Sequence, residues 1–316
     1  MTTTRRQRPL IAQNITELIG NTPLLALSAT NRELHTNIIA KLESFNPLSS
    51  VKDRVGLSMI EDAECSGRLK QGDTIIESTS GNTGIGLALV AKAKGYKLVI
   101  VMPETMSEER KILLKALGAE LVLTDGTKGM LGAIEKAGEL TEKHGYVRMG
   151  QTKNPANPDA HRTTTALEIF EDTNGQVDVF VAGSGTGGTI TGIGETLKKL
   201  KPSVKVVVVE PAASAVISGG APGPHAIQGM GPGFIPEVLN RNIIDEIVTV
   251  KDDEATQGAR ELLNSEGIFV GISSGAAFVA AKQIAIKEET RGKTVVVLFA
   301  DSGERYLSTT LFSGEN

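Results

Sequence analysis

The segment Val177-Asp-Val-Phe-Val-Ala-Gly-Ser-Gly-Thr-Gly-Gly-Thr-Ile190 runs from a continuously apolar stretch through a glycine-rich loop into the start of a helix. An uninterrupted apolar run is typical of a parallel strand that is covered on both faces. Glycines let the N–H groups of the loop converge, and the helix N-terminus adds partial positive charge, so the loop is suited to a phosphate. The segment therefore predicts an α/β fold with an anion site at the end of a strand.

Short β-branched runs and helical segments alternate along almost the whole chain, which favours parallel sheets. The predicted strands are Ile38–Glu43, Thr74–Glu77, Lys97–Met102, Glu120–Thr124, Val177–Ala182, Lys205–Glu210 and Thr294–Ala300. The predicted helices, each followed by glycine, are Asp53–Ser66, Gly84–Lys94 and Met130–His144. Two Asn-Pro pairs between Gln151 and Asp159 indicate a junction, so we expect domains over residues 1–154 and 155–316.

Composition excludes several classes of function. The 316 residues carry a net charge of −4 and only 3% aromatic residues, which argues against nucleic-acid binding. No apolar run approaches the ~20 residues of a membrane span, so no membrane association is expected. The four histidines have no metal-ligand spacing, and no metal is predicted. The single cysteine, Cys65, excludes an intramolecular disulfide and fits a reducing cytoplasm.

The glycine loop has two competing interpretations. Its glycines also satisfy the G-x-G-x-x-G dinucleotide fingerprint, and Glu210 ends the next predicted strand, where a ribose-binding acid belongs. On this segment alone the two sites are evenly matched, and a tight turn without a ligand is a third possibility. Thr186 and Thr189 favour a monophosphate, because their hydroxyls add hydrogen-bond donors to those of the main chain.

A second loop, Ser78-Thr-Ser-Gly-Asn-Thr-Gly84, also follows a predicted strand and opens onto a helix. Small hydroxyl and amide residues at a helix N-terminus suit a carboxylate or a phosphate, although they are also good helix caps. Lys52 begins another predicted helix, where the helix dipole disfavours its positive charge. The same field favours the neutral amine, which is the form that makes an imine. Two anion sites and such a lysine suit an amino acid joined to pyridoxal 5′-phosphate (PLP).

These motifs occur in the order and spacing of the cysteine synthase (O-acetylserine sulfhydrylase) family, within the larger cysteine synthase/cystathionine β-synthase group. The chain resembles this family from about Ile15 to Phe312. The matching segments are Leu18–Leu24, Ser50–Arg54, Thr79–Gly84, Met102–Ser107, Gly185–Thr189, Gly271–Gly275 and Gly303–Thr309. The resemblance favours PLP over a dinucleotide.

The resemblance implies the tryptophan-synthase-β-like fold (fold type II of PLP enzymes). Two α/β domains would hold the cofactor in the cleft between them, and the first ~40 residues would pack on the other domain. It also implies a homodimer. A further implied partner is the C-terminal tail of serine acetyltransferase, which ends in isoleucine and would enter the carboxylate site.

The resemblance also assigns roles to residues. Lys52 would form the imine with PLP and later remove the Cα proton of the substrate. Asn82 would bind the ring hydroxyl of PLP, and Ser273 would face its pyridine nitrogen. The implied phosphate cradle is Gly185, Thr186, Gly187, Gly188 and Thr189. The residues implied to bind the substrate carboxylate are Thr79, Ser80, Gly81, Thr83 and Gln151.

The implied reaction is β-replacement: acetate leaves O-acetylserine, and sulfide adds to the resulting aminoacrylate to give cysteine. The chain departs from the family pattern at Thr152, where an aromatic residue is usual, and at Ala166-Leu167, where Gly-Pro is usual. Alanine at position 166 is similar to cystathionine β-synthases. Condensation of serine or O-acetylserine with homocysteine is therefore the alternative reaction.

Overall fold

The computed structural model describes residues 8–312, which divide into two compact units. The large unit contains residues 20–45 and 161–312, and the small unit contains residues 8–19 and 46–160. The sequence places a domain boundary after residue 154, whereas the chain passes from one unit to the other after Ala160. Residues 1–7 and 313–316 of the expected domains lie outside the described residues. Within residues 8–312 no helix is long and apolar enough to cross a membrane.

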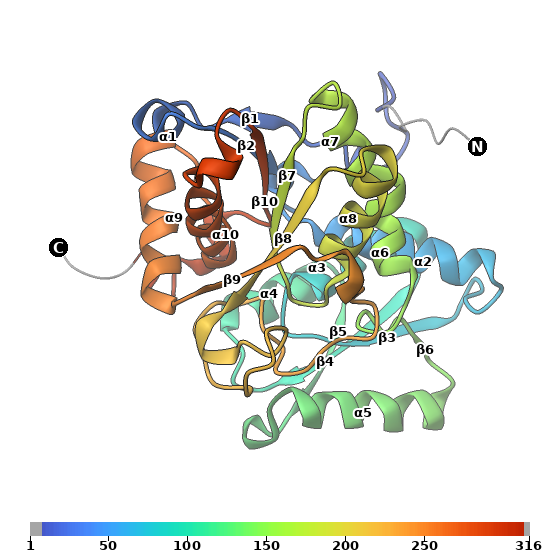
Figure 1. Cartoon of the computed structure of the whole chain (residues 1–316). Coiled ribbons are helices and arrows are strands. Elements are labelled where there is room, and N and C mark those ends of the chain that lie inside the picture. Colours follow the sequence, from blue (N-terminus) through green and yellow to red (C-terminus); the bar gives the residue numbers. More distant parts are fainter. Residues whose placement is uncertain (1–7, 313–316) are drawn as a thin grey trace. The chain divides into compact units, whose positions relative to one another are not determined.

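The large unit is built on a six-stranded sheet with strand order β1-β2-β10-β7-β8-β9. All neighbouring strands are parallel except β1 and β2. In Figure 1, α9 and α10 lie on one side of this sheet and α7 and α8 on the other. The strands are β1 (Leu24–Ala26), β2 (Asn37–Leu42), β7 (Val179–Gly183), β8 (Lys205–Pro211), β9 (Glu246–Val250) and β10 (Thr294–Phe299). The α-helices are α1 (Ser28–Leu34), α7 (Ala166–Asp172), α8 (Gly188–Leu200), α9 (Asp252–Glu266) and α10 (Ile272–Ala285).

The small unit contains a four-stranded parallel sheet with strand order β5-β4-β3-β6. Its strands are β3 (Thr74–Ser78), β4 (Lys97–Pro103), β5 (Glu120–Thr124) and β6 (Val147–Arg148). Its α-helices are α2 (Lys52–Cys65), α3 (Asn82–Lys94), α4 (Glu108–Ala116), α5 (Gly129–His144) and α6 (Ala156–Ala160). Ile75 and Ile100 pack with the α2 and α3 residues, whereas Ile76 and Val99 pack against α5. Successive side chains of each strand therefore face opposite helical layers, as parallel strands require.

The α/β class and all seven predicted strands are confirmed, with ends that differ by at most two residues. Three strands were not predicted. β1 and β6 have only three and two residues, too few to show a periodicity, and β9 is an edge strand with mixed burial. The predicted helix ends are also confirmed, because Gly95 and Gly145 adopt the left-handed conformation directly after α3 and α5.

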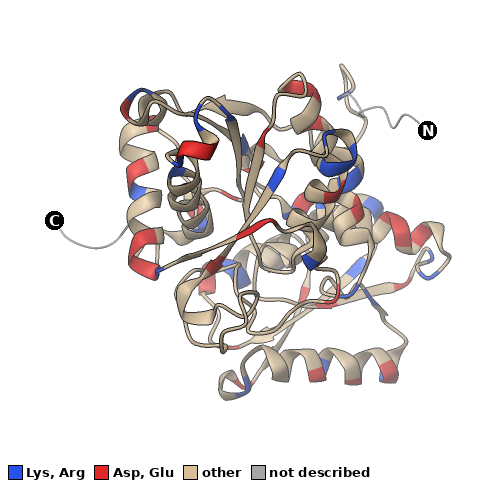
Figure 2. Ribbon diagram, viewed as in Figure 1, with Lys and Arg blue, Asp and Glu red and all other residues tan. Residues whose placement is uncertain are grey.

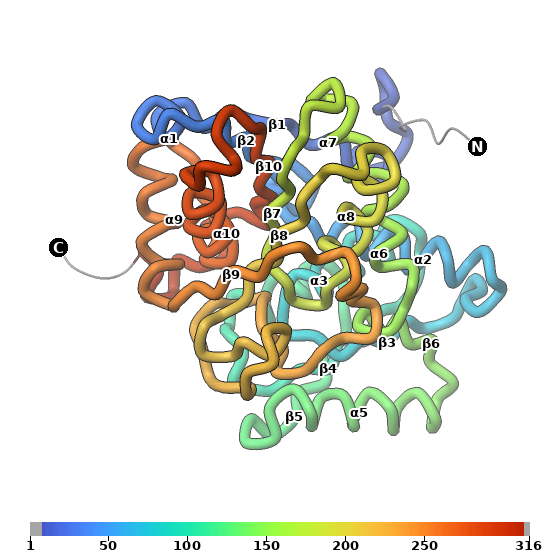
Figure 3. The backbone as a smooth tube through the Cα atoms, viewed as in Figure 1, coloured from blue at the N-terminus to red at the C-terminus, as the bar shows by residue number. Residues whose placement is uncertain are grey.

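Two further features of the structure are a charged helix, α5, and a long irregular connection between β8 and β9. Acidic and basic residues are interspersed along α5, as Figure 2 shows. Figure 3 shows the long connection from β8 to β9, which contains only the short 3-10 helices Ala212–Ser214 and Arg241–Ile243. It includes the Gly- and Pro-rich stretch of residues 218–236.

A buried ion pair joins the two chain segments of the large unit. Lys41 on β2 is fully buried, and its Nζ lies 2.7 Å from Glu168 Oε2 on α7. The same ammonium donates to the Thr22 carbonyl oxygen at 2.6 Å, and the Asn21 N–H donates to Glu168 Oε1 at 2.9 Å. Because a buried charge needs both a counter-ion and hydrogen bonds, these contacts tie residues 20–45 to α7.

Candidate functional site

Lys52 is the first residue of α2, and close packing against α3 determines its position. A Cβ atom on Gly86 would lie 2.7 Å from the Lys52 carbonyl carbon, and one on Gly56 would lie 2.7 Å from the Gly86 carbonyl carbon. Such contacts are too short for any side chain, so two glycines let the helices touch through their main chains. The crossing brings the start of α3, with Asn82, near the start of α2.

The loop from Thr79 to Thr83 leads from β3 into α3. Its Gly81 is the N-cap of α3 and, as a glycine, has no side chain that could cap the helix. The Thr83 hydroxyl donates to Gln151 Oε1 at 2.6 Å. The structure thus brings Gln151, which follows β6, beside the predicted carboxylate loop of the same unit.

Arg110 on α4 is a contact of this loop that the sequence analysis missed. Its Nη1 donates to the Ser80 carbonyl oxygen at 3.1 Å. The two residues are 30 positions apart in the sequence, and no local pattern joins them. The contact supports the main chain of the loop from a neighbouring helix.

The predicted phosphate loop of the large unit follows β7 and opens onto α8. Gly187 is the N-cap of α8, has φ +82°, and makes no side-chain cap. A Cβ atom at this position would meet Leu239 Cβ at 2.7 Å, and one on Gly185 would clash with the Gly229 carbonyl oxygen. Both positions therefore exclude a side chain. The uncapped N–H groups at the start of α8 form the kind of cradle that binds a phosphate.

His161 is a second residue that the sequence analysis missed. It is fully buried in the π-helical turn His161–Thr165, and π turns are frequent at functional sites. Its Nε2 lies 3.2 Å from Thr189 Oγ1 of the phosphate loop, and its Nδ1 lies 3.0 Å from Thr165 Oγ1. If the Thr189 hydroxyl donates to a phosphate, its oxygen accepts from Nε2–H, and in the neutral imidazole Nδ1 then accepts from the Thr165 hydroxyl.

Glu210, the candidate ribose-binding acid, has a structural role instead. It is buried, and its carboxylate accepts hydrogen bonds from Ile217 N at 2.8 Å and Ser218 N at 2.9 Å, and from the Ser218 hydroxyl. These bonds hold the chain that returns from β8. A carboxylate engaged in this way is not presented to a ribose, which removes the support for a dinucleotide site.

Ser273 lies in the first turn of α10 and is half-buried. The N-cap of this helix, Gly271, also makes no side-chain cap. The neighbouring Ser274 accepts the Ala300 N–H at 3.0 Å, which fixes the start of α10 to the end of β10. The Ser273 side chain is therefore carried by a rigid element.

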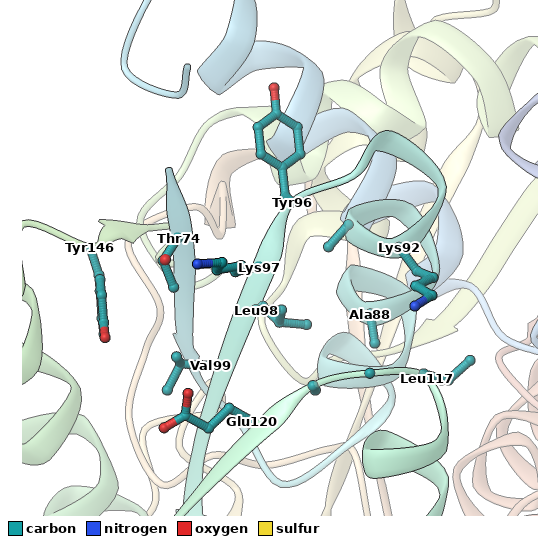
Figure 4. Close-up of a pocket in the computed structure, with 13 residues that line it drawn as sticks. Thr74, Ala88, Lys92, Tyr96, Lys97, Leu98, Val99, Leu117, Glu120 and Tyr146 are labelled. Atoms are coloured by element: carbon teal, nitrogen blue, oxygen red, sulfur yellow. The ribbon is translucent and has the colours of Figure 1, made fainter. Parts of the chain in front are cut away.

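A cavity of about 440 Å³ lies in the small unit, at the end of the sheet where β3, β4 and β5 begin. Figure 4 shows Thr74, Lys97 and Glu120, which begin β3, β4 and β5, together with Lys92 of α3. Ligands of open α/β sheets bind beyond the carboxyl ends of the strands, where the Thr79–Thr83 loop lies. This cavity is therefore separate from the predicted site residues.

The residues present fit PLP. In the large unit, the glycine N-cap of α8 suits the phosphate of PLP. In the small unit, the glycine N-cap of α3 suits a carboxylate, and Lys52 at the start of α2 supplies an amine. Within residues 8–312 no group of three or more His, Cys, Asp or Glu side chains is arranged to hold a metal ion.

Comparisons with known proteins agree with this chemistry. Residues 15–301 match the family described as pyridoxal-phosphate dependent enzyme. The cysteine synthase of Staphylococcus aureus strain Mu50 is 54% identical over 308 residues, which cover 97% of this chain and 98% of the relative. O-acetylserine sulfhydrylase isoform 3 of Entamoeba histolytica has a similar structure, with a TM-score of 0.94, 51% identity and coverage of 100% of this chain and 96% of that chain. An O-ureido-L-serine synthase has a TM-score of 0.93, 47% identity and coverage of 97% and 96%, respectively.

The helix crossing gives a first prediction. Gly86→Ala is expected to lower the free energy of unfolding in urea by about 1–3 kcal/mol, because the added methyl meets the Lys52 main chain rather than a flexible side chain. The amount of PLP bound per chain should fall as well. Gly138→Ala on α5 is the control, since nothing lies within 4 Å of its added Cβ. Wild-type stability together with full PLP content in Gly86→Ala would contradict the prediction.

Proposed function

Because the chain belongs to the family of pyridoxal-phosphate-dependent enzymes, we propose that it forms L-cysteine from O-acetyl-L-serine and sulfide, with release of acetate. The observation that carries the proposal is the 54% identity to a cysteine synthase over nearly the full length of both chains. The activity is a β-replacement, and PLP is the cofactor.

Three groups of residues would hold the cofactor. The main-chain N–H groups of Gly185, Gly187 and Gly188 bind its phosphate, and the hydroxyls of Thr186 and Thr189 add donors. Asn82 would bind the ring hydroxyl, and Ser273 would lie opposite the ring nitrogen. When bound, PLP supplies an electron sink for the charge that develops at the Cα of the substrate. A neutral serine hydroxyl opposite the ring nitrogen keeps that sink weak, which favours β-elimination over transamination.

Lys52 would carry the proton chemistry. Its amine would hold the cofactor covalently, and the same amine would accept the Cα proton of the substrate. The helix start of α2 favours the neutral amine that this step needs. Main-chain and hydroxyl donors of Thr79, Ser80, Gly81 and Thr83, together with the Gln151 amide, hold the substrate carboxylate. A fixed carboxylate orients the Cα–H bond towards Lys52.

Removal of the proposed base is the direct test. Lys52→Ala is expected to lower the rate of cysteine formation by about 10²–10⁴-fold, the usual contribution of a positioned acid or base. The absorption band of the lysine-bound cofactor should disappear while the thermal unfolding midpoint stays close to wild type. Lys143→Ala, at the exposed end of α5, is the matched control. Near-normal turnover in Lys52→Ala would show that another group removes the proton.

The charges of the proposed site favour O-acetylserine over O-phosphoserine as the donor. The loop from Ser78 to Gly84 contains no Lys or Arg, and the stretch of residues 219–236 has only His225 as a possible cation. His225 Nε2 lies 3.0 Å from the Gly231 carbonyl oxygen. Arg110 does reach the first loop, but its Nη1 donates to the Ser80 carbonyl oxygen. Burial of a phosphoryl dianion without a dedicated cation costs several kcal/mol.

We therefore expect O-acetylserine to give the highest initial rate when O-acetylserine, O-phosphoserine and serine are compared at equal concentration and fixed sulfide. Free serine should be slowest, because hydroxide is a poor leaving group and needs a dedicated acid. A rate with O-phosphoserine equal to that with O-acetylserine would contradict this assignment of the donor.

Condensation of serine or O-acetylserine with homocysteine is the alternative activity. It rests on Ala166-Leu167, which is similar to cystathionine β-synthases. Both residues are buried at the start of α7, where they pack rather than line an open surface. The relatives described above do not favour this alternative.

The proposal extends to partners and location. We expect a homodimer in the cytoplasm, where the single Cys65 stays reduced. The carboxylate-binding residues should also accept a peptide that ends in a free isoleucine carboxylate, as in the tail of serine acetyltransferase. Such a peptide is expected to raise the apparent KM for O-acetylserine without changing kcat, and the same peptide amidated at its C-terminus is the control. Equal inhibition by the two peptides would contradict binding through the free carboxylate. A monomeric mass by light scattering would contradict the homodimer.

A further inference from the structure

Glu77 is a buried acid that the proposed reaction does not use. It is the second-last residue of β3, and its side chain is 2% exposed. The strand continues from Glu77 through Ser78 directly into the carboxylate loop that begins at Thr79. A buried carboxyl at this position is costly unless hydrogen bonds satisfy its oxygens, so its partners indicate what it does.

The partners of Glu77 are two successive main-chain N–H groups. Oε2 accepts the Gly150 N–H at 2.7 Å, and the Gln151 N–H also donates to the carboxylate. Gly150 has φ +67°, the left-handed conformation in which consecutive N–H groups can converge on one anion. Glu77 therefore holds the turn that follows β6.

This turn carries Gln151. The Gln151 side chain accepts the Thr83 hydroxyl at 2.6 Å, and the main-chain carbonyl oxygen of Gln151 accepts Asn157 Nδ2–H at 2.7 Å. β6 itself is short: only Val147 and Arg148 pair with β3. The hydrogen bonds between β3 and β6 therefore end at Met149, whose N–H donates to the Ile76 carbonyl oxygen at 3.3 Å. Beyond Met149, the Glu77 carboxylate continues the attachment of this segment to β3, as far as Gln151, which contacts Thr83 of the carboxylate loop.

We propose that Glu77 is a positioning residue for the substrate carboxylate: it fixes Gln151, through the N–H groups of residues 150 and 151, against the Thr79–Thr83 loop that its own strand delivers. This inference rests on the proposed function, because the ligand is the carboxylate of the amino-acid substrate. Glu77 acts through Gln151 and has no contact with the reacting atoms in this scheme.

The protonation of Glu77 should then affect substrate binding. Burial raises the pKa of Glu77 to about 7, although the Gly150 and Gln151 N–H groups and the charge of Arg148 lower it. Arg148 lies on β6, and the residue that faces Glu77 across the ladder on β4 is the apolar Ile100. Above pH 7 a carboxylate accepts both N–H groups; below it, a neutral acid accepts them more weakly.

The pH dependence of the contribution of Glu77 to the free energy of unfolding is opposite to that of an acid whose pKa is lowered by folding. The pKa of Glu77 is higher in the folded chain than its ordinary value of 4.5, so the folded state binds more protons between these values. The contribution of Glu77 to stability therefore falls as the pH rises from about 4.5 to 7. Tighter binding of substrate at high pH is thus obtained at the expense of stability.

The test compares steady-state kinetics of wild type and Glu77→Gln at two pH values, with O-acetylserine varied. At pH 8 the KM of Glu77→Gln is expected to rise about tenfold while kcat stays within about twofold, since binding and not chemistry is disturbed. At pH 6, where wild-type Glu77 is mostly protonated, the KM ratio should shrink to about threefold or less. Amide exchange of residues 150 and 151, which needs no turnover, should be faster in the variant at pH 8.

Glu64→Gln is the matched control. Glu64 also accepts two hydrogen bonds within the small unit, from Lys94 Nζ at 2.8 Å and the Tyr96 hydroxyl at 2.9 Å, but it lies on α2 away from the turn. Its removal should leave the KM and its pH dependence unchanged.

A second pair of variants keeps the test decisive if Glu77→Gln fails to fold. Gly150→Ala strains the turn itself, whereas Gly145→Ala places the same strain after α5; φ is +67° and +69°, and nothing lies within 4 Å of either added Cβ. Only Gly150→Ala should raise the KM. An inactive wild-type protein would refute the proposed function. An active wild type whose KM is unaltered in both Glu77→Gln and Gly150→Ala would refute the role of Glu77 alone.

Discussion

The contact between Gly86 and the main chain of Lys52 is the constraint on which the small unit depends. Helices that touch through their main chains have one relative placement, because no side chain can adjust to take up a shift. The start of α2 is thereby fixed with respect to the start of α3. A reactive lysine and a carboxylate-binding loop need such a fixed relation, since small displacements reduce the rate of an oriented reaction strongly.

Glycine also occupies the N-cap positions of three helices. α3, α8 and α10 begin after strand ends or tight loops, and each begins at a glycine N-cap that makes no side-chain cap. A serine or aspartate at these N-caps would add a side-chain cap and gain only a few tenths of a kcal/mol per helix relative to glycine. Other helices, such as α4 and α5, also lack a side-chain cap, so the feature particular to α3, α8 and α10 is a glycine at the N-cap, which leaves room for an anion close to the main chain.

Much of this could be predicted from the sequence because it is encoded locally. Apolar runs defined the strands, glycines defined the loops, and the anomalous lysine at a helix start stood out within a few residues. Contacts over long separations could not be predicted. Glu77 and Gly150 are 73 positions apart, and Thr189 and His161 are 28 apart. The sequence left Glu210 as a candidate ribose ligand in the rival dinucleotide interpretation, because its real partners lie in an irregular segment with no recognisable pattern.

Glu77 and Glu210 solve the same structural problem in the two units. Each is buried one residue before the end of a parallel strand, and each accepts two successive N–H groups from a segment that has no ladder partner of its own. An ionised carboxylate suits this task better than an amide, because both of its oxygens accept and neither atom donates. Glutamine would direct an NH₂ group at one of the N–H donors. The need for two acceptors therefore accounts for acids at positions where burial disfavours charge, and the side chain that holds Gln151 also becomes sensitive to pH near 7.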